Sequence, residues 1–277
     1  MHDELGALTA RRPVTTFSPS LTEKDVDHFR ESGFVSIDRI TTDEELAWLG
    51  EVYDLIFKGE TAAFRSASWD LVRPIESDGA DRLPQVIHPE LRYPVLKETL
   101  LRRNGRRLAA QLMDLDERLL EGWGHMIYKP ARIGEPLPWH QDEAYWDPTL
   151  VYRALGCWMP LDDATPENGA MKFIPGSHKS EVRQHHHLND DPTTPALYVD
   201  VTPEDEARAV TLPVAAGGAI FHHSRTLHAS GPNRSARERR AYANEWQLSP
   251  QQARVAADRP WVEESRRAMA EIRARRG

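Results

Sequence analysis

Apolar side chains recur at helical spacing in the first part of the chain. In the segment LTEKDVDHFRESGFVSI, Val26 and Phe29 lie on one side of a predicted helix, and Gly33 ends that helix before a strand-like run at 34–37. Residues 42–45 resemble a capping box and predict the start of a second, amphipathic helix. The inner side of that helix carries Leu46, Leu49, Val52, Tyr53 and Ile56.

The remaining N-terminal segments have less regular patterns. We expect residues 1–19 to form an irregular polar leader and residues 60–92 to be rich in loops. Residues 93–122 return to helical spacing through Leu96, Leu100, Leu108, Leu112 and Leu115. Residues 1–120 are therefore predicted to be mostly helical.

From about residue 121 the pattern changes to short apolar runs separated by proline and glycine. The runs between 121 and 249 are GWGHMIYKP, YRALGCWMPL, GAMKFIPGS, ARAVTLPV, GGAIFHH and RRAYANEWQL. Such runs are typical of an antiparallel sandwich or barrel. Residues 250–277 are predicted to contain a helix that begins near Pro260. We therefore expect a single domain over residues 1–277, with a β core at 121–249.

Composition narrows the class of protein. Apolar residues make up 40% and charged residues 28% of the 277 residues, as in a globular protein. The net charge of −8 gives no general basic footprint for nucleic acid. Residues 251–277 carry seven arginines against four acids, which we interpret as a solvated helix face. With no apolar run near ~18 residues and no secretory signal, we expect a cytoplasmic protein that does not enter a membrane.

The candidate chemistry is that of a metal held by nitrogen and oxygen. Cys157 is the only cysteine and is predicted to be a small core residue, whereas the chain has twelve histidines. In Trp139-His140-Gln141-Asp142, the i, i+2 spacing places His140 and Asp142 on one face of a strand, with Gln141 turned away. The segment GGAIFHHSRTLHASGPN offers a second histidine at 222, 223 or 228. Two imidazoles and one carboxylate leave positions open on an octahedral Fe(II), as in non-haem oxygenases.

An arginine that could bind a carboxylate follows the histidine-containing segment. Arg239 lies eleven residues after His228, in a strand-like run. An oxygenase that uses 2-oxoglutarate needs such a cation to grip the distal carboxylate, and arginine does so bidentately. Ser230 shares the strand face of His228 and can donate to the same carboxylate. The alternative is a surface arginine paired with Glu238 or Glu245.

Several segments then match one family in its own order. They lie between residues 21 and 245 and read LTEKDVDHFRESGFVSI, TDEELAWL, YKP, WHQD, ENGAMKFIPGSHK and HASGPNRSARERRA. In this order they resemble the phytanoyl-CoA dioxygenase family of Fe(II)/2-oxoglutarate oxygenases. The resemblance implies a double-stranded β-helix, or jelly roll, flanked by helices. It also implies Fe(II), 2-oxoglutarate and O2 as the reactive groups.

The resemblance further assigns positions in the site. It implies an iron site formed by His140, Asp142 and His228. It implies that the cosubstrate is held by Arg239, with Ser230, Trp158 and His125 also at cosubstrate positions. The family often has an apolar residue where His125 stands, so His125 is a departure from the pattern. Related halogenases lack the carboxylate ligand, so the presence of Asp142 favours hydroxylation.

The substrate is expected to be a small metabolite or a natural-product intermediate. Gln141, Tyr145 and Trp146 follow the first ligand and are our candidates for substrate contact, although the two aromatic residues could instead pack the barrel rim. Residues 62–88, with Arg65, Trp69, Arg73 and Gln85, are candidates for a lid. A zinc hydrolase and a metal-free binding protein on the same fold remain as alternatives. The sequence makes no prediction of oligomeric state.

The other histidines receive structural interpretations. Residues 185–187 are three consecutive histidines that resemble a metal-binding tract, but they stand between polar residues and are predicted to form a solvated loop. His222 and His223 stand where the family has a structural histidine after a phenylalanine. His178 is expected to order a turn.

Overall fold

Two antiparallel sheets form the centre of the protein. The structure is a computed structural model that describes residues 2–58 and 68–276. In this part of the chain the larger sheet has seven strands in the order β1-β12-β7-β14-β4-β3-β2, and the smaller sheet has four in the order β11-β8-β13-β5. This is the mainly β architecture with flanking helices that the sequence predicts.

The strand bounds show which segments build each sheet. The larger sheet consists of β1 (Phe34–Ile37), β2 (Ser68–Asp70), β3 (Pro84–Ile87), β4 (Glu121–Lys129), β7 (Ala154–Pro160), β12 (Ala219–His223) and β14 (Arg239–Gln247). The smaller sheet consists of β5 (Leu137–His140), β8 (Met171–Phe173), β11 (Val210–Leu212) and β13 (His228–Ser230). Two short pairs lie apart, formed by β9 (His186–His187) with β10 (Leu197–Tyr198) and by β6 (Leu150–Val151) with β15 (Gln251–Gln252).

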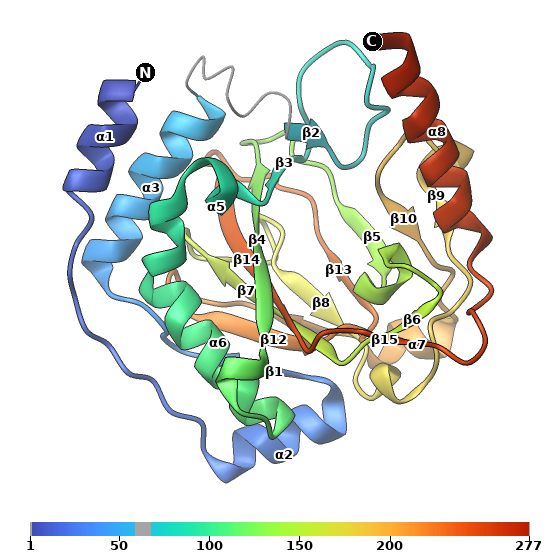
Figure 1. The fold of residues 1–277 in the computed structure, drawn as a ribbon, viewed down its shortest axis with the longest axis horizontal. Helices are drawn as coiled ribbons and strands as arrows, with labels where there is room; N and C mark the ends of the chain where they lie inside the picture. The colour runs from blue at the N-terminus through green and yellow to red at the C-terminus, as the bar shows by residue number, and fades with distance from the viewer. Residues whose placement is uncertain (1, 59–67, 277) are drawn as a thin grey trace.

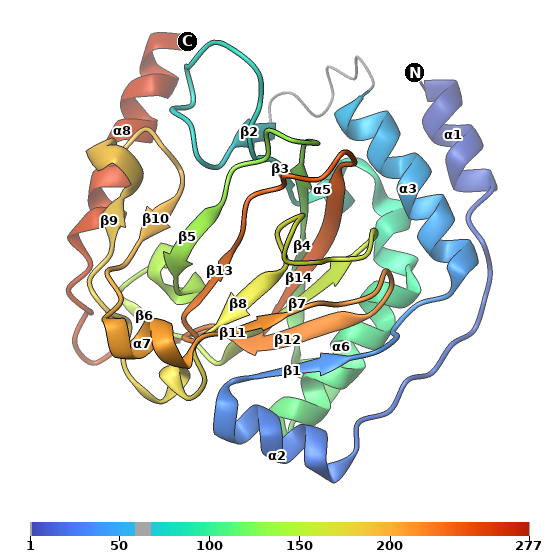
Figure 2. The ribbon, with the colours of Figure 1, turned by 180° about the vertical axis from the view of Figure 1, so that it is seen from behind.

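Helices cover the outer face of the larger sheet. Figures 1 and 2 show α1 (His2–Ala10), α3 (Asp43–Phe57) and α6 (Leu100–Met113) on that side, while α8 (Pro260–Arg276) lies at the opposite side of the molecule. The shorter or peripheral helices are α2 (Glu23–Ser32), α5 (Pro89–Arg92) and α7 (Pro203–Arg208). The prediction of a terminal helix beginning near Pro260 is confirmed. No helix among residues 2–58 and 68–276 is both long enough and apolar enough to cross a membrane.

Alternate residues of β14 face the two neighbouring layers. Tyr242 and Trp246 belong to the large apolar cluster formed with α3 and α6, which also contains the buried Cys157. Ala241 belongs to a second cluster, which includes Phe173 of the smaller sheet, and Ala243 packs against that cluster. Since side chains alternate along a strand, the odd-numbered residues of β14 face the space between the two sheets.

The prediction of an irregular leader at 1–19 is wrong. The supposed leader begins with α1, and Leu8 of this helix is buried and accepts a hydrogen bond of 2.8 Å from Trp48 Nε1. The strand predicted at 34–37 forms as β1, and the N-terminal 120 residues also supply β2 and β3 to the larger sheet. These strands cover sheet edges that would otherwise leave backbone groups unpaired.

The expected capping box at 42–45 forms only in part. Thr42 accepts from the backbone N–H of Glu45, but the Glu45 carboxylate does not return to Thr42. Glu45 is 1% exposed and accepts instead from the backbone N–H groups of Leu100 at 2.7 Å and Leu101 at 3.0 Å, and from the Thr41 hydroxyl at 2.8 Å. It therefore caps the start of α6 from the side of α3.

Removing this cap is expected to destabilise the fold. Glu45→Ala leaves the two backbone donors of Leu100 and Leu101 buried without a partner, so the free energy of unfolding should fall by roughly 2–4 kcal/mol. Urea denaturation followed by circular dichroism measures the loss. Glu44→Ala, in the same turn but exposed, serves as the control. Equal stability of the two variants would contradict this role for Glu45.

Candidate functional site

The structure brings His140, Asp142 and His228 together. His140 ends β5 and His228 begins β13, and the two are direct partners in the pairing of these strands. Asp142 opens a 3-10 turn (Asp142–Tyr145) instead of continuing the strand, which differs from the strand geometry expected for the His-x-Asp sequence. One potential ligand atom from each residue lies within 4.8 Å of the others.

Backbone carbonyls orient both imidazole rings. His140 Nδ1 lies 2.8 Å from the carbonyl oxygen of Pro138, and His228 Nδ1 lies 2.9 Å from that of Thr226. Each Nδ1 must therefore carry the proton, which leaves Nε2 as the free ligand atom. The Asp142 Oδ1 atom lies 3.8 Å from His140 Nε2 and 3.5 Å from His228 Nε2. Three ligand atoms thus converge on one point.

The protonation states suit metal binding. Burial lowers the pKa of both His140 and His228, so both rings are neutral and can bind a cation. Burial alone would raise the pKa of Asp142, but His228, His222 and His140 together outweigh this effect and lower it. The site therefore offers two neutral nitrogens and one carboxylate, the donor set that Fe(II) takes in oxygenases.

His222 holds the second oxygen of the carboxylate. Its Nε2 donates to Asp142 Oδ2 at 2.9 Å, and the ring is 4% exposed. Gly156 of β7 provides the space for this ring, because a Cβ there would lie 2.6 Å from His222 Cε1. His222 is thus a structural partner of a ligand, in agreement with its assignment from the family pattern.

A buried ion-pair network fixes the turn that carries Asp142. The Glu143 carboxylate accepts from Arg225 Nε at 2.8 Å and from Arg259 Nη2 at 2.9 Å. Arg225 lies between β12 and β13, and Arg259 directly precedes α8. Three distant segments are therefore joined beside the ligand. Sequence reasoning missed this network because nothing in the local pattern marks these long-range partners.

Gln141 is buried and bonded to backbone, and two of the three histidines at 185–187 are buried as well. Gln141 is 1% exposed; its side-chain amide donates to the Arg225 carbonyl at 2.7 Å and accepts from the Arg183 N–H at 2.8 Å. With both ends of the amide bonded to backbone, it is not among the residues that line the cavity beside the ligands. His185 accepts from the Gln141 N–H at 3.1 Å. His185 and His187 are 2% and 6% exposed, so the prediction of a solvated loop is wrong for these two.

The strand register aligns the other candidates on the inner face of the larger sheet. In β14, Arg239, Ala241, Ala243 and Glu245 follow one another on this face. The partners opposite them in β4 are Lys129, Ile127, His125 and Trp123. Trp158 of β7 is the other partner of Ala243. The two alanines carry the smallest side chains of this row and separate Arg239 at one end from Glu245 at the other.

Arg239 is a buried cation that pairs with no carboxylate of the described residues. It is 1% exposed, and its Nε and Nη1 atoms have no hydrogen-bond partner among the described residues. Its guanidinium lies 5.3 Å from the ring centre of Trp158. Burial lowers the pKa of Arg239 to about 10, which still leaves it charged at neutral pH. The alternative of a surface arginine paired with Glu238 or Glu245 does not hold.

Ser230 and His125 complete the placement of the expected cosubstrate residues. Ser230, two residues after His228 on β13, is 5% exposed and in register with Met171 of β8. His125 hydrogen-bonds to the Gln85 side chain, and burial lowers its pKa to about 4. A neutral, fixed imidazole therefore stands where the family often has an apolar side chain.

A cavity of about 380 Å³ lies in front of the ligands. Its walls include His140, Asp142 and His125, and it is lined further by Trp69, Leu71, Gln85, Ile87, His88, Trp123, Leu137, Tyr145, Trp146, Pro195 and Glu245. Tyr145 and Trp146, our candidates for substrate contact, thus line this cavity. From the candidate lid, Trp69 and Gln85 contribute, whereas Arg73 donates to the Asp78 and Ala80 carbonyls. Arg65 lies outside the described residues.

Glu245 is a cavity residue that sequence reasoning did not identify. Burial raises its pKa well above the ordinary range, and the charge of Asp142 adds to this effect. Its Oε2 atom has no hydrogen-bond partner among the described residues. A neutral carboxyl group can both donate and accept, so Glu245 offers the cavity a polar contact.

The family follows from comparison with known proteins. The sequence profile of the family described as Phytanoyl-CoA dioxygenase (PhyH) matches residues 29–241. The chain belongs to this family. The membership that the motifs predict is therefore confirmed.

Individual known proteins resemble different portions of the chain. It is 36% identical over 132 residues to the probable alpha-ketoglutarate-dependent hypophosphite dioxygenase of Stutzerimonas stutzeri, a match that covers 44% of each protein. The matched part thus spans less than half of that curated relative. The crystal structure of EvdO2 from Micromonospora carbonacea var. aurantiaca is 36% identical, with a TM-score of 0.78, over 89% of this chain and 99% of that one. A second structure of EvdO2, complexed with 2-oxoglutarate, gives a TM-score of 0.76 at 35% identity.

Loss of the His222 hydrogen bond is expected to weaken metal binding. His222→Phe leaves Asp142 Oδ2 without its donor, and loss of such a partner costs about 10–100-fold in metal affinity. Anaerobic titration with Fe(II) against a competing chelator measures the change. His28→Phe, on an exposed face of α2, is the control and should bind Fe(II) like the wild type. An unchanged affinity in His222→Phe would show that the hydrogen bond does not support the ligand.

Proposed function

We propose that the protein is an Fe(II)- and 2-oxoglutarate-dependent dioxygenase. It hydroxylates an unactivated C–H bond of a small organic molecule, with succinate and CO2 as co-products. The observation that carries the proposal is the buried Arg239 guanidinium, which has no carboxylate partner among the described residues and lies between the same two sheets as the His140, Asp142 and His228 cluster.

Fe(II) fits the three ligands. His140 and His228 present neutral Nε2 atoms, and Asp142 presents Oδ1 while His222 holds its other oxygen. Bound iron would supply the activation of O2, coupled to oxidative decarboxylation of 2-oxoglutarate. The side chains of this chain contribute the fixed geometry and a pocket of limited water access. A zinc hydrolase could use the same three ligands, but it has no use for a buried arginine such as Arg239.

2-Oxoglutarate fits the row of residues on the inner face of the larger sheet. Arg239 would take its distal carboxylate, because a buried guanidinium requires an anion and binds a carboxylate bidentately. The short side chains of Ala241 and Ala243, which follow Arg239 on the same face of β14, would border the carbon chain. Ser230, Trp158 and His125 would contact it from the sides, as the resemblance implies. The EvdO2 structure complexed with 2-oxoglutarate supports this cosubstrate.

The substrate would occupy the cavity in front of the ligands. Tyr145 and Trp146 supply aromatic surface, while Glu245 and His125 supply polar contacts near Asp142. Gln141 is left out of the proposed contacts because its amide is bonded to backbone. A volume of about 380 Å³ suits a small organic molecule or one end of a larger molecule.

The metal and cosubstrate assignments are tested together. The metal-free protein, incubated anaerobically with Fe(II) and 2-oxoglutarate, should develop the weak visible charge-transfer band of the chelate. Asp142→Ala should lose the band by losing Fe(II). Arg239→Leu should still bind Fe(II), but its affinity for 2-oxoglutarate should fall by at least about 100-fold, because the buried carboxylate of the cosubstrate loses its partner. Arg237→Leu, exposed and two residues upstream, is the control. No band, with 2-oxoglutarate failing to bind, would overturn the proposed function.

The substrate cavity is tested with a substrate found by screening compounds for succinate release. Trp146→Ala removes aromatic surface from the cavity wall and should raise KM by about tenfold, while the affinities for Fe(II) and 2-oxoglutarate stay the same. Tyr198→Ala, whose ring borders a different groove, is the matched aromatic control. An unchanged KM in Trp146→Ala would mean that Trp146 only packs the barrel rim.

A further inference from the structure

A second cavity adjoins the one in front of the ligands. It has a volume of about 510 Å³ and lies beside α8. Trp69, Tyr145 and Pro195 line both cavities and form the boundary between them. Tyr145 is 37% exposed, one of the few large aromatic or apolar side chains in the described residues that remain this accessible. Any molecule that reaches past these three residues from the inner cavity enters the outer one.

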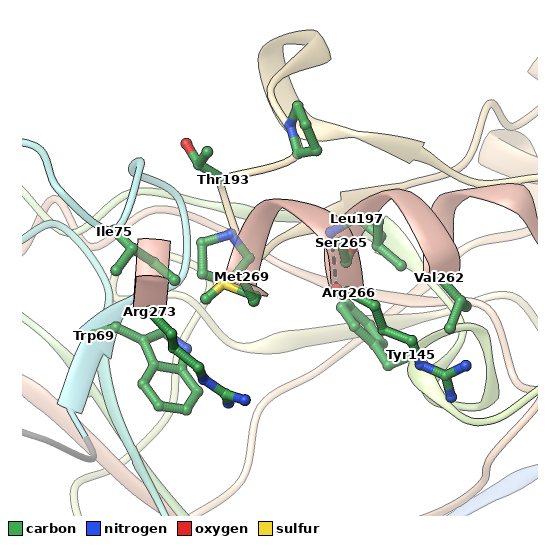
Figure 3. Close-up of a pocket in the computed structure, with 12 residues that line it drawn as sticks. Trp69, Ile75, Tyr145, Thr193, Leu197, Val262, Ser265, Arg266, Met269 and Arg273 are labelled. Atoms are coloured by element: carbon green, nitrogen blue, oxygen red, sulfur yellow. Dashed lines mark hydrogen bonds between the residues drawn. The ribbon is translucent and has the colours of Figure 1, made fainter. Parts of the chain in front are cut away.

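The outer cavity has mostly apolar walls. Figure 3 shows Met269 of α8 at its centre, between Trp69 on one side and Tyr145 on the other. Ile75, Leu197 and Val262 add further apolar surface. The hydroxyl of Tyr145 accepts from the Leu197 N–H at 2.9 Å, which fixes the ring at the boundary between the two cavities. An occupant would therefore place an apolar body here.

The charge of the outer cavity is opposite to that of the whole protein. Among the described residues that line it are Arg266 and Arg273 but no aspartate or glutamate, although the net charge of the chain is −8. Arg266 is paired with Asp147 at 3.0 Å. Arg273 has no ion pair or hydrogen bond with any residue that the structure describes, and in Figure 3 it lies beside Trp69. One cation at the cavity is therefore free to meet an anion.

We propose that the outer cavity binds the distal part of the substrate, and that this substrate is an elongated organic acid. Its apolar body lies against Trp69 and Met269, its acidic group meets Arg273, and its other end reaches past Tyr145 to the metal ligands. The inner cavity alone would limit the substrate to a small molecule. This inference rests on the proposed function for the identity of the occupant.

The outer cavity can be tested before a substrate is known. The probe is 1-anilinonaphthalene-8-sulfonate, which combines an aromatic body with one sulfonate, titrated into the full chain loaded anaerobically with Fe(II) and 2-oxoglutarate. Saturable binding is expected in the wild type. Met269→Trp fills the apolar part and should abolish it, and Arg273→Gln should weaken it about tenfold by removing a charge-assisted contact. Arg267→Gln, which is exposed on the same helix and pairs with Glu263, is the control.

The outcomes separate this inference from the proposed function. The charge-transfer band of Fe(II) and 2-oxoglutarate should persist in Met269→Trp and Arg273→Gln, which also shows that they are folded. No saturable binding in the wild type, or equal binding in both variants and in Arg267→Gln, would overturn the outer site. Loss of the band in the wild type would count against the proposed function alone.

A substrate from the succinate screen gives the second test. Arg273→Gln should raise its KM about tenfold and leave kcat unchanged, because the contact lies far from the reacting end. Replacing the acid group of the substrate by an uncharged group should also raise KM about tenfold in the wild type. The same replacement should leave the KM of Arg273→Gln unchanged. A substrate whose KM is the same in wild type and Arg273→Gln would contradict the proposal.

Discussion

The free-energy penalty for burying charged side chains between the two sheets determines how the site is built. Removing one partner of a buried pair typically costs 3–5 kcal/mol, so buried ions in proteins are normally paired. Glu143 follows this rule, because it is held by both Arg225 and Arg259. Arg239 departs from it, as it is equally buried but has no carboxylate partner among the described residues. The ion pairs of Glu143 hold the turn that carries Asp142. The unpaired charge of Arg239 favours the binding of an anionic cosubstrate.

Side chains alternate between the two faces of a β-strand, so the residues of β14 that pack in the apolar core differ from those that face the site. On β14, Tyr242 and Trp246 pack with α3 and α6, whereas Arg239 and Glu245 face the space between the sheets. One strand therefore serves both the apolar core and the site without mixing them. A register slip of one residue would turn the charged side chains into the helical layer, so the long pairing of β14 with β4 and β7 also fixes the site.

Local motifs in the sequence predicted part of this arrangement. His140, Asp142, His228 and Arg239 were accessible because two short segments carry them and a family pattern spans both. Contacts between distant segments determine the network around Glu143, the cap that Glu45 forms on α6 and the position of Glu245 in the cavity. The local spacing of apolar residues does not predict such contacts. The histidines at 185 and 187 were misread for the same reason, since their polar neighbours gave no sign that α8 and the ligand strand would cover them.

The part of the chain that matches the family and the part that extends beyond it contribute differently to the cavities. The match covers residues 29–241, which include the three candidate ligands and Arg239. Glu245 and the α8 side chains Val262, Met269 and Arg273 lie after it. Segments outside a shared scaffold can change without disturbing the chemistry that the scaffold holds. Selection among substrates would therefore draw on β14 beyond residue 241 and on α8 as well as on Tyr145 and Trp146 within the matched portion, while the residues proposed to bind iron and 2-oxoglutarate all lie within it.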